Sequence, residues 1–142
     1  MKRAALYLRA STSKKTRTVA GEEYRQRPEI QEERLRLLCS QRSWEVVGVY
    51  CDRSSGRKEV RPELTRLIED ARRGLFDVVA VAAFDRFARS LKHLVTALDE
   101  FRSLSIDFVS LREAIDTSTP TGRLTYQIMG AMAEFESALI SE

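Results

Sequence analysis

The segment AALYLRASTS, residues 4–13, joins an apolar run to an arginine and a cluster of hydroxyl groups. The apolar run is typical of a buried β-strand, and it passes directly into Arg9 and then into Ser11. In α/β folds ligands bind beyond the carboxyl ends of the strands, so both side chains are expected at a binding edge. There Arg9 can bind an anion and Ser11 can attack it. The alternative is a surface charge followed by a turn or helix cap.

The size and charge of the chain favour one domain with a basic end. Its 142 residues are 43% hydrophobic, enough for one compact core. The net charge of +3 is too small to indicate a nucleic-acid-binding protein by itself. However, all charged residues before Glu22 are basic, namely Lys2, Arg3, Arg9, Lys14, Lys15 and Arg17. This distribution favours a phosphate near the first strand.

The sequence contains no metal, nucleotide or membrane motif. Cys39 and Cys51 do not form a CxxC pair, and His93 has no companion at metal-ligand spacing. Neither a P-loop nor a dinucleotide fingerprint occurs. No apolar run reaches the roughly 20 residues that span a bilayer, and the basic start lacks the apolar core of a signal peptide. We therefore expect a cytoplasmic protein with reduced thiols, no cofactor and no membrane contact.

Strand-like and helix-like segments alternate along the chain. Strands are expected at residues 4–8, 44–50, 77–84 and 106–111, and helices from Pro28, from Pro62 and over residues 91–101. The first helix is expected to bury Ile30, Leu35, Leu37 and Leu38. This order predicts a single three-layer α/β domain with a mostly parallel sheet of four to five strands, flanked by helices.

A last helix is predicted from apolar residues that recur every three or four positions. These residues are Leu124, Ile128, Met132, Phe135 and Leu139. The helix is expected to begin near the turn at residues 119–121, and its pattern is still running at Glu142. Either the helix continues in a longer protein, or it packs on a partner subunit.

Charged residues follow the second and third predicted strands as well as the first. Asp52 follows the second strand, with Arg61 beyond it, and Asp85, Arg86 and Arg89 follow the third. One such cluster is most simply a solvated ion pair worth at most about 1 kcal/mol. Three clusters at one edge favour a site, and Arg86 and Arg89 are expected on one face of a helix start.

Guanidiniums around a serine suit phosphoryl transfer without a metal. Fixed arginines can hold the charge of the transition state and make an alkoxide at Ser11 less costly. Asp85 either donates a proton to the departing oxygen or holds Arg86 in position. The group Ser54, Ser55 and Gly56 is most simply a turn, although its amides can also contact a phosphate. The long polar segment 14–27 is expected to be a functional loop.

Several motifs together resemble the catalytic domain of serine recombinases, the resolvase and invertase family. They are YLRAST at 7–12, IQ at 30–31, Asp52 with SG at 55–56, RP at 61–62, DRFARS at 85–90, DTSTPTG at 116–122 and AEFE at 133–136. The motifs stand in the order of the family and cover nearly the whole chain. One departure is Glu136-Ser137, where the family usually has Glu-Arg.

The resemblance implies site-specific DNA recombination that needs no metal or cofactor. Ser11 would attack a DNA phosphodiester, leaving a 5′-phosphoserine link and a free 3′-hydroxyl. Asp85 would be the acid or organiser, and Asp52 would support the arginines. The phosphate and DNA contacts would come from Arg9, Arg86 and Arg89, helped by Arg61, Gln31 and Ser55.

The resemblance also implies an assembly. Residues 1–120 would form the resolvase-like catalytic domain, and residues 121–142 would start a long helix for a homodimer and for a tetramer in the synaptic complex. The separate C-terminal DNA-binding domain of such enzymes is not found in this sequence, so weak DNA affinity is expected from these residues alone.

Two other interpretations stay open at this point. A receiver-like or flavodoxin-like interaction module would use Asp52 and Asp85 as an acidic pocket. It would leave four arginines without a purpose: Arg9, Arg61, Arg86 and Arg89. A transposase or regulatory relative would keep the site and use it on another DNA substrate.

Overall fold

The computed structural model describes residues 1–11, 28–54 and 61–141. Along these residues the elements are β1 (Arg3–Ser11), α2 (Pro28–Gln41), β2 (Glu45–Ser54), α3 (Pro62–Arg72), β3 (Val78–Val81), α4 (Phe84–Phe87), α5 (Leu91–Ser103), β4 (Asp107–Ser110), β5 (Ile115–Asp116) and α6 (Pro120–Ser141). No helix in these ranges is long and apolar enough to cross a membrane.

The strands form one five-stranded sheet in the order β2-β1-β3-β4-β5. The first four strands in this order run parallel, and β5 pairs antiparallel with β4. The predicted α/β class and mostly parallel sheet are therefore confirmed. Because β1 to β4 point the same way, the residues that follow them emerge at one edge of the sheet, which we call the carboxyl edge.

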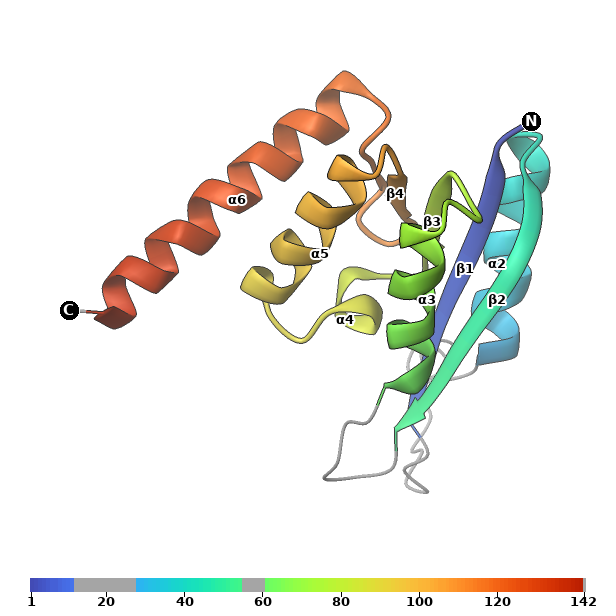
Figure 1. The fold of residues 1–142 in the computed structure, drawn as a ribbon, viewed down its shortest axis with the longest axis horizontal. Helices are drawn as coiled ribbons and strands as arrows, with labels where there is room; N and C mark the ends of the chain where they lie inside the picture. Colours follow the sequence, from blue (N-terminus) through green and yellow to red (C-terminus); the bar gives the residue numbers. More distant parts are fainter. Residues whose placement is uncertain (12–27, 55–60, 142) are drawn as a thin grey trace.

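Helices cover both faces of the sheet (Figure 1), which confirms the three-layer prediction. On one face, Leu35 and Cys39 of α2 pack against Leu6 and Leu8 of β1. On the other face, α3, α4, α5 and α6 contribute to a second cluster that includes Tyr7. The β1 residues at positions 4–8 are at most 1% exposed because helices lie on both sides of them.

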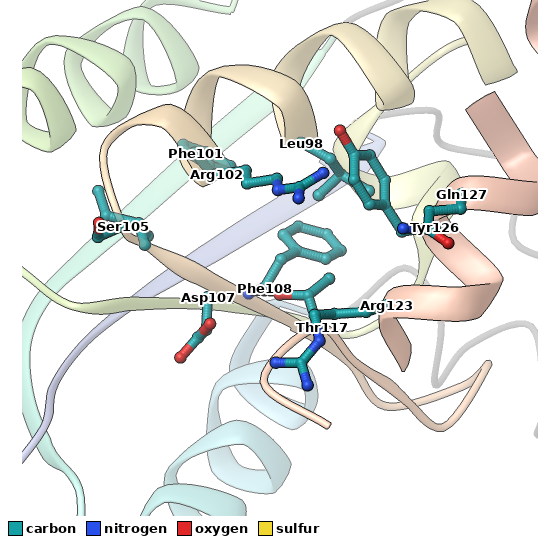
Figure 2. A pocket seen from close by; sticks show the side chains of 11 residues that line it. Leu98, Phe101, Arg102, Ser105, Asp107, Phe108, Thr117, Arg123, Tyr126 and Gln127 are labelled. Atoms are coloured by element: carbon teal, nitrogen blue, oxygen red, sulfur yellow. Dashed lines mark hydrogen bonds between the residues drawn. The ribbon is translucent and has the colours of Figure 1, made fainter. Parts of the chain in front are cut away.

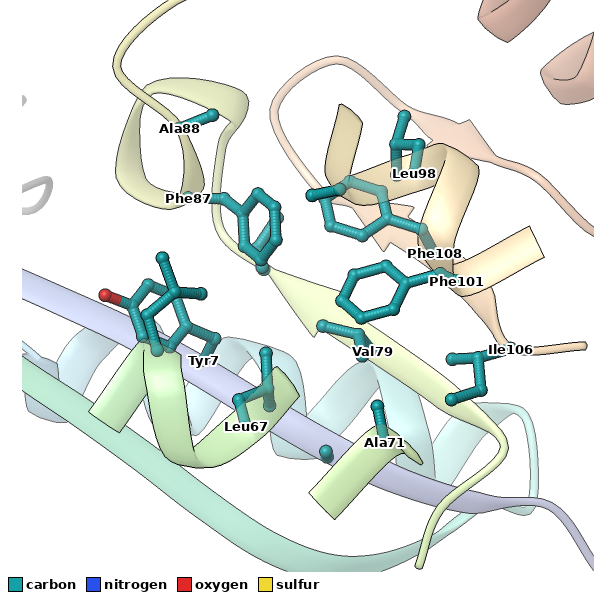
Figure 3. Packing of buried hydrophobic residues seen from close by; sticks show 14 of the residues in the cluster. Tyr7, Leu67, Ala71, Val79, Phe87, Ala88, Leu98, Phe101, Ile106 and Phe108 are labelled. Atoms are coloured by element: carbon teal, nitrogen blue, oxygen red, sulfur yellow. The ribbon is translucent and has the colours of Figure 1, made fainter. Parts of the chain in front are cut away.

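The expected strand at 77–84 is shorter than predicted. It ends at Val81, and Phe84 opens the four-residue helix α4. This turn forms because it buries the Phe87 side chain fully. The centre of the Phe87 ring lies 5.9 Å from the centre of the Tyr7 ring and 5.1 Å from the centre of the Phe108 ring (Figure 3). The expectation that Arg86 and Arg89 share one helix is wrong, since Arg89 follows Ala88, whose backbone is extended at φ −129° and ψ 151°.

Two other details differ from the sequence expectations. Leu37 is 59% exposed, because helical geometry aligns Gln31, Leu35 and Cys39 on the buried side of α2 and turns Leu37 away. The second strand extends beyond residue 50 to Ser54, so that Asp52 lies inside β2 instead of following it.

The start of α6 is fixed by Asp116 at the end of β5. Its carboxylate accepts hydrogen bonds from the Ser118 amide at 2.8 Å and the Ser118 hydroxyl at 2.6 Å, and it pairs with Arg42 after α2. Burial alone would raise the pKa of Asp116, but these hydrogen bonds outweigh it and hold the pKa below its ordinary value. Thr119 then caps α6, its hydroxyl accepting from the Gly122 amide at 3.0 Å.

We expect Gly122→Ala to destabilise the chain by about 2 kcal/mol, because its new methyl group would overlap the β5 backbone. A Cβ at this position would lie 1.8 Å from the Asp116 carbonyl oxygen. Gly130→Ala is the matched control within α6, since a Cβ added at position 130 would lie 3.9 Å from the Val95 side chain and contact nothing nearer. Because alanine favours a helix more than glycine does, Gly130→Ala should stabilise the chain by up to about 1 kcal/mol. Urea unfolding measures both, and a midpoint for Gly122→Ala at or above that of Gly130→Ala would contradict the packing described.

Candidate functional site

The carboxyl edge brings together most of the charged residues that the sequence singles out. The parallel register places Arg9 of β1 beside Asp52 of β2 and the backbone of Ser11 beside that of Ser54. Asp85 and Arg86 reach the same edge on α4, which directly follows β3. Residues that lie up to about 75 positions apart in the chain are therefore neighbours, as the convergence of parallel strands predicts.

Asp52 is a buried hydrogen-bond acceptor, only 2% exposed. Its Oδ1 accepts from the Glu63 amide at 3.0 Å, and its Oδ2 accepts from the Leu64 amide at 2.9 Å and from the Tyr7 hydroxyl at 2.7 Å. The carboxylate therefore satisfies the first amides of α3 and complements the dipole of that helix. Both of its oxygens are used inside the domain, which argues against the open acidic pocket of a receiver-like module.

Tyr7 links Asp52 to Arg61. Its hydroxyl donates to Asp52 and accepts from Arg61 Nε at 3.1 Å, and the Arg61 guanidinium lies 5.3 Å from the centre of the Tyr7 ring. Burial, the largest influence, raises the pKa of Tyr7, so the hydroxyl keeps its proton near neutral pH. From the sequence, Tyr7 was predicted as a residue of the apolar strand and of the motif at 7–12, with no role at the site. The sequence did hold one indication of this role, because a tyrosine in a buried strand needs a hydrogen-bond partner for its hydroxyl.

Arg61 also holds α4 in place. Its Nη2 donates to the Phe87 carbonyl at 2.5 Å and to the Arg86 carbonyl at 3.2 Å. Its Nη1 is buried and has no hydrogen-bond acceptor in the part of the chain that the structure describes. A buried guanidinium donor without an acceptor is unfavourable, so this position suits an added anionic ligand.

Arg9 is anchored through both its backbone and its side chain. The Gln31 side-chain amide, on a residue that is 1% exposed, donates to the Arg9 carbonyl at 3.3 Å. Arg9 Nη2 donates to the Asp85 carbonyl at 2.9 Å. The half-buried guanidinium thereby connects β1 to α4 at the carboxyl edge.

The segment after β4 brings two further residues to the carboxyl edge that were not predicted from the sequence. Arg112 lies 3.3 Å from the Asp85 carboxylate, and Glu113 accepts from the Phe84 amide at 3.1 Å, capping α4. Arg112 also pairs with Glu113 at 3.1 Å. The available signal was their position directly beyond a parallel strand, the same signal that singled out the other clusters.

The remaining predicted residues are less completely placed. Arg89 lies exposed between α4 and α5, and its amide donates to His93 Nδ1 at 3.5 Å. Ser11 ends β1, but its side chain lies outside what the structure describes, as do Ser55 and the predicted loop at 14–27. The gathering of the arginines around the Ser11 hydroxyl therefore stays a prediction.

The described part of the carboxyl edge carries groups that are able to bind an anion. Three guanidiniums, on Arg9, Arg61 and Arg86, lie on elements tied to one another by side-chain to carbonyl hydrogen bonds. In residues 1–11, 28–54 and 61–141 no group of three or more histidine, cysteine or acidic side chains is placed to hold a metal. Fixed guanidiniums of this kind bind carboxylates or phosphates through charge-assisted hydrogen bonds.

Comparison with known proteins gives a consistent result. Residues 4–142 match the family model described as Resolvase, N terminal domain. A DNA-invertase of Escherichia phage P1 is 44% identical over 94 residues, which are 66% of this chain and 50% of the phage protein. The serine recombinase gin of Escherichia phage Mu is 42% identical over 94 residues, covering 66% of this chain and 48% of the phage protein. Each matched region therefore spans about half of its phage protein.

A solved structure extends the similarity to the fold of the whole chain. The crystal structure of the N-terminal catalytic domain of TP901-1 integrase matches with a TM-score of 0.78 and 36% sequence identity. The match covers 97% of this chain and 98% of that domain.

Proposed function

Because the chain belongs to the resolvase N-terminal domain family, the catalytic domain of serine recombinases, we propose that it cleaves and rejoins DNA through Ser11. Proteins of this family act on DNA, as the name of the phage P1 relative states. The observation that carries the proposal is the interlocked arginine cluster at the carboxyl edge, in which Arg9 lies on the strand that ends at Ser11.

In the proposed reaction, the Ser11 hydroxyl oxygen forms a bond to the phosphorus of a DNA phosphodiester. The Ser11 hydroxyl loses its proton, the bond from that phosphorus to the 3′ oxygen breaks, and the 3′ oxygen takes up one proton and leaves as a hydroxyl, so that the number of protons is unchanged. The product is a 5′-phosphoserine link, and attack by a 3′-hydroxyl reverses the step and rejoins the strand. Because the covalent link keeps the phosphoester, no energy-rich co-substrate is needed.

The arginines supply the electrostatic part of this proposal. Arg9, Arg86 and Arg89 bind the phosphate and stabilise the negative charge of the transition state, helped by Arg61, Gln31 and a DNA contact at Ser55. The buried Arg61 Nη1, which has no acceptor among the described residues, supports an anion at this position. Guanidiniums in these roles take the place that a divalent cation has in other phosphoryl-transfer enzymes.

The acidic residues are assigned supporting roles. Asp52 acts through Tyr7 on Arg61, because its oxygens are occupied by amides and a hydroxyl. Asp85 accepts from Arg9 through its backbone and contacts Arg112 through its carboxylate, which favours an organising role over proton donation. An exposed ion pair such as Asp85 with Arg112 adds at most about 1 kcal/mol of stability, so its effect is on orientation.

The α6 helix is proposed as the assembly element. Its outward face exposes five large apolar side chains, each at least 52% accessible: Leu124, Ile128, Met132, Phe135 and Leu139. A continuous apolar stripe of this kind marks a protein interface. We therefore propose that residues 1–120 form the catalytic unit and that residues 121–142 join two copies into a homodimer, which pairs into a tetramer for recombination.

The reaction is tested with the full-length protein, supercoiled DNA carrying its recombination site, and a chelator. We expect a protein–DNA adduct that survives detergent, because a phosphoserine link is covalent. Ser11→Ala should abolish the adduct, since no nucleophile remains. Gel analysis after denaturation measures this. Adduct formation by Ser11→Ala, or its loss on adding the chelator, would contradict the proposed chemistry.

Tyr7→Phe should slow strand cleavage by about tenfold or more, because Arg61 loses the acceptor that orients its guanidinium. Tyr50→Phe is the matched control, since the Tyr50 hydroxyl makes a similar bond, at 2.6 Å, to Asp70 in the second half of α3. Single-turnover cleavage rates measure the effect. Equal rates for the two variants would show that the link between Tyr7 and Arg61 does not position the site.

Ile128→Glu should convert the dimer to a monomer, because it places a charge in the middle of the apolar stripe. Ala138→Glu adds the same charge to an exposed position of α6 outside the stripe and should leave the dimer intact. Sedimentation velocity measures the mass of each. A parent chain that stays monomeric, or a dimer that tolerates Ile128→Glu, would exclude α6 as the assembly element.

A further inference from the structure

A cavity of about 220 Å³ lies between α5, β4 and the first turns of α6. Its lining includes Ser105 and Asp107, where β4 begins, so the cavity lies towards the edge of the sheet opposite the proposed DNA site. None of the proposed catalytic residues lines it. The cavity consequently needs an explanation separate from strand cleavage.

The walls of the cavity are aromatic and aliphatic. Leu98, Phe101 and Phe108 on the core side are each at most 4% exposed, and Tyr126 faces them from α6. Figure 2 shows the Phe108 ring inside the pocket and the Arg102 side chain reaching across it towards Tyr126. A flat apolar group that enters here therefore meets rings from both the core and α6.

The rim of the cavity carries excess positive charge. Arg102 lies 6.0 Å from the centre of the Tyr126 ring, and Arg123 approaches from α6. Among the described residues neither guanidinium has a carboxylate within 4.0 Å. Asp107, the one carboxylate lining the cavity there, is already paired with Lys2 at 2.5 Å. The unneutralised charge at the rim favours an anionic ligand.

The size of the cavity limits this ligand to about one ring. An apolar protein cavity of about 150 Å³ is large enough to bind benzene. A volume of about 220 Å³ leaves room for one six-membered ring and a short acidic chain. Small-molecule sites typically combine apolar walls with a few polar groups that fix orientation, as this cavity does.

We propose that this cavity binds a small monocyclic carboxylate. Its ring lies between Phe108 and Tyr126, and its carboxylate meets Arg102 and Arg123. Because α6 supplies Arg123, Tyr126 and Gln127 and the core supplies most of the remaining wall, the bound molecule fastens the first turns of α6 to the core. The proposal does not rest on the recombination chemistry, since the two sites share no residue.

The probe for this site is 3-phenylpropionate, titrated into the isotopically labelled 142-residue chain and followed by the NMR shifts of backbone amides. We expect saturable shifts that centre on Leu98, Phe108 and Tyr126, with a Kd of roughly 1 mM for a ligand of this size. Two control compounds separate the contributions. Neutral 3-phenylpropionamide should bind roughly tenfold more weakly, because it lacks the charge, and acetate should leave these amides unshifted.

Substitutions at the rim test the assigned contacts. Arg102→Met and Arg123→Met should each weaken 3-phenylpropionate binding roughly tenfold, the size of one charge-assisted hydrogen bond. Arg73→Met removes an exposed arginine after α3 and should leave binding unchanged. The amide spectra of the variants also report whether each remains folded. Equal binding of the amide and the carboxylate, shifts that spread over the whole surface, or unchanged affinity in both rim variants would overturn the proposal.

Discussion

The hydrogen bond between the Tyr7 hydroxyl and the Asp52 carboxylate is the contact on which the arrangement of the carboxyl edge depends. This bond, 2.7 Å between the Tyr7 hydroxyl and Asp52 Oδ2, joins the neighbouring strands β1 and β2 inside the core. Each of the two side chains is also bonded to a further part of the domain. Asp52 satisfies the first amides of α3, and Tyr7 receives Arg61, which in turn holds the backbone of α4. A buried network in which each acceptor is used orders its members more strongly than separate pairs would. The arginines therefore stand on a rigid base instead of a flexible surface.

This network explains why the acidic residues are not equivalent. A carboxylate that takes two amides and a hydroxyl is committed to structure, as Asp52 is. Asp85 differs because its carboxylate lies at the exposed edge against Arg112, while only its backbone carbonyl is used by Arg9. The contrast follows from depth in the sheet: Asp52 lies inside a strand, two residues before its end, whereas Asp85 lies on a short helix beyond one.

The sequence was sufficient to predict the parallel sheet, because its strands are short apolar runs separated by helices with one apolar side. It also identified Arg9, Asp52, Arg61 and Asp85 as neighbours, since parallel strands deliver their ends to one edge. It failed at the end of the third strand: Phe84 is typical of a strand and was predicted in one, yet it opens a helical turn in which its ring packs on Phe108. Tyr7 and Arg112 were missed because their partners are fixed only by tertiary packing, which periodicity does not encode.

The short helix α4 has a mechanical consequence. Phe87 is the one fully buried side chain of α4, and the centre of its ring lies 6.0 Å from the centre of the Phe101 ring of α5. Helix α5 in turn lies against α6. Densely filled interiors transmit small displacements instead of absorbing them. A tilt of α6 that moves α5 is therefore passed through two rings to the residue next to Arg86. The carboxyl edge is in this way connected to α6 through packed side chains, with no loop in between.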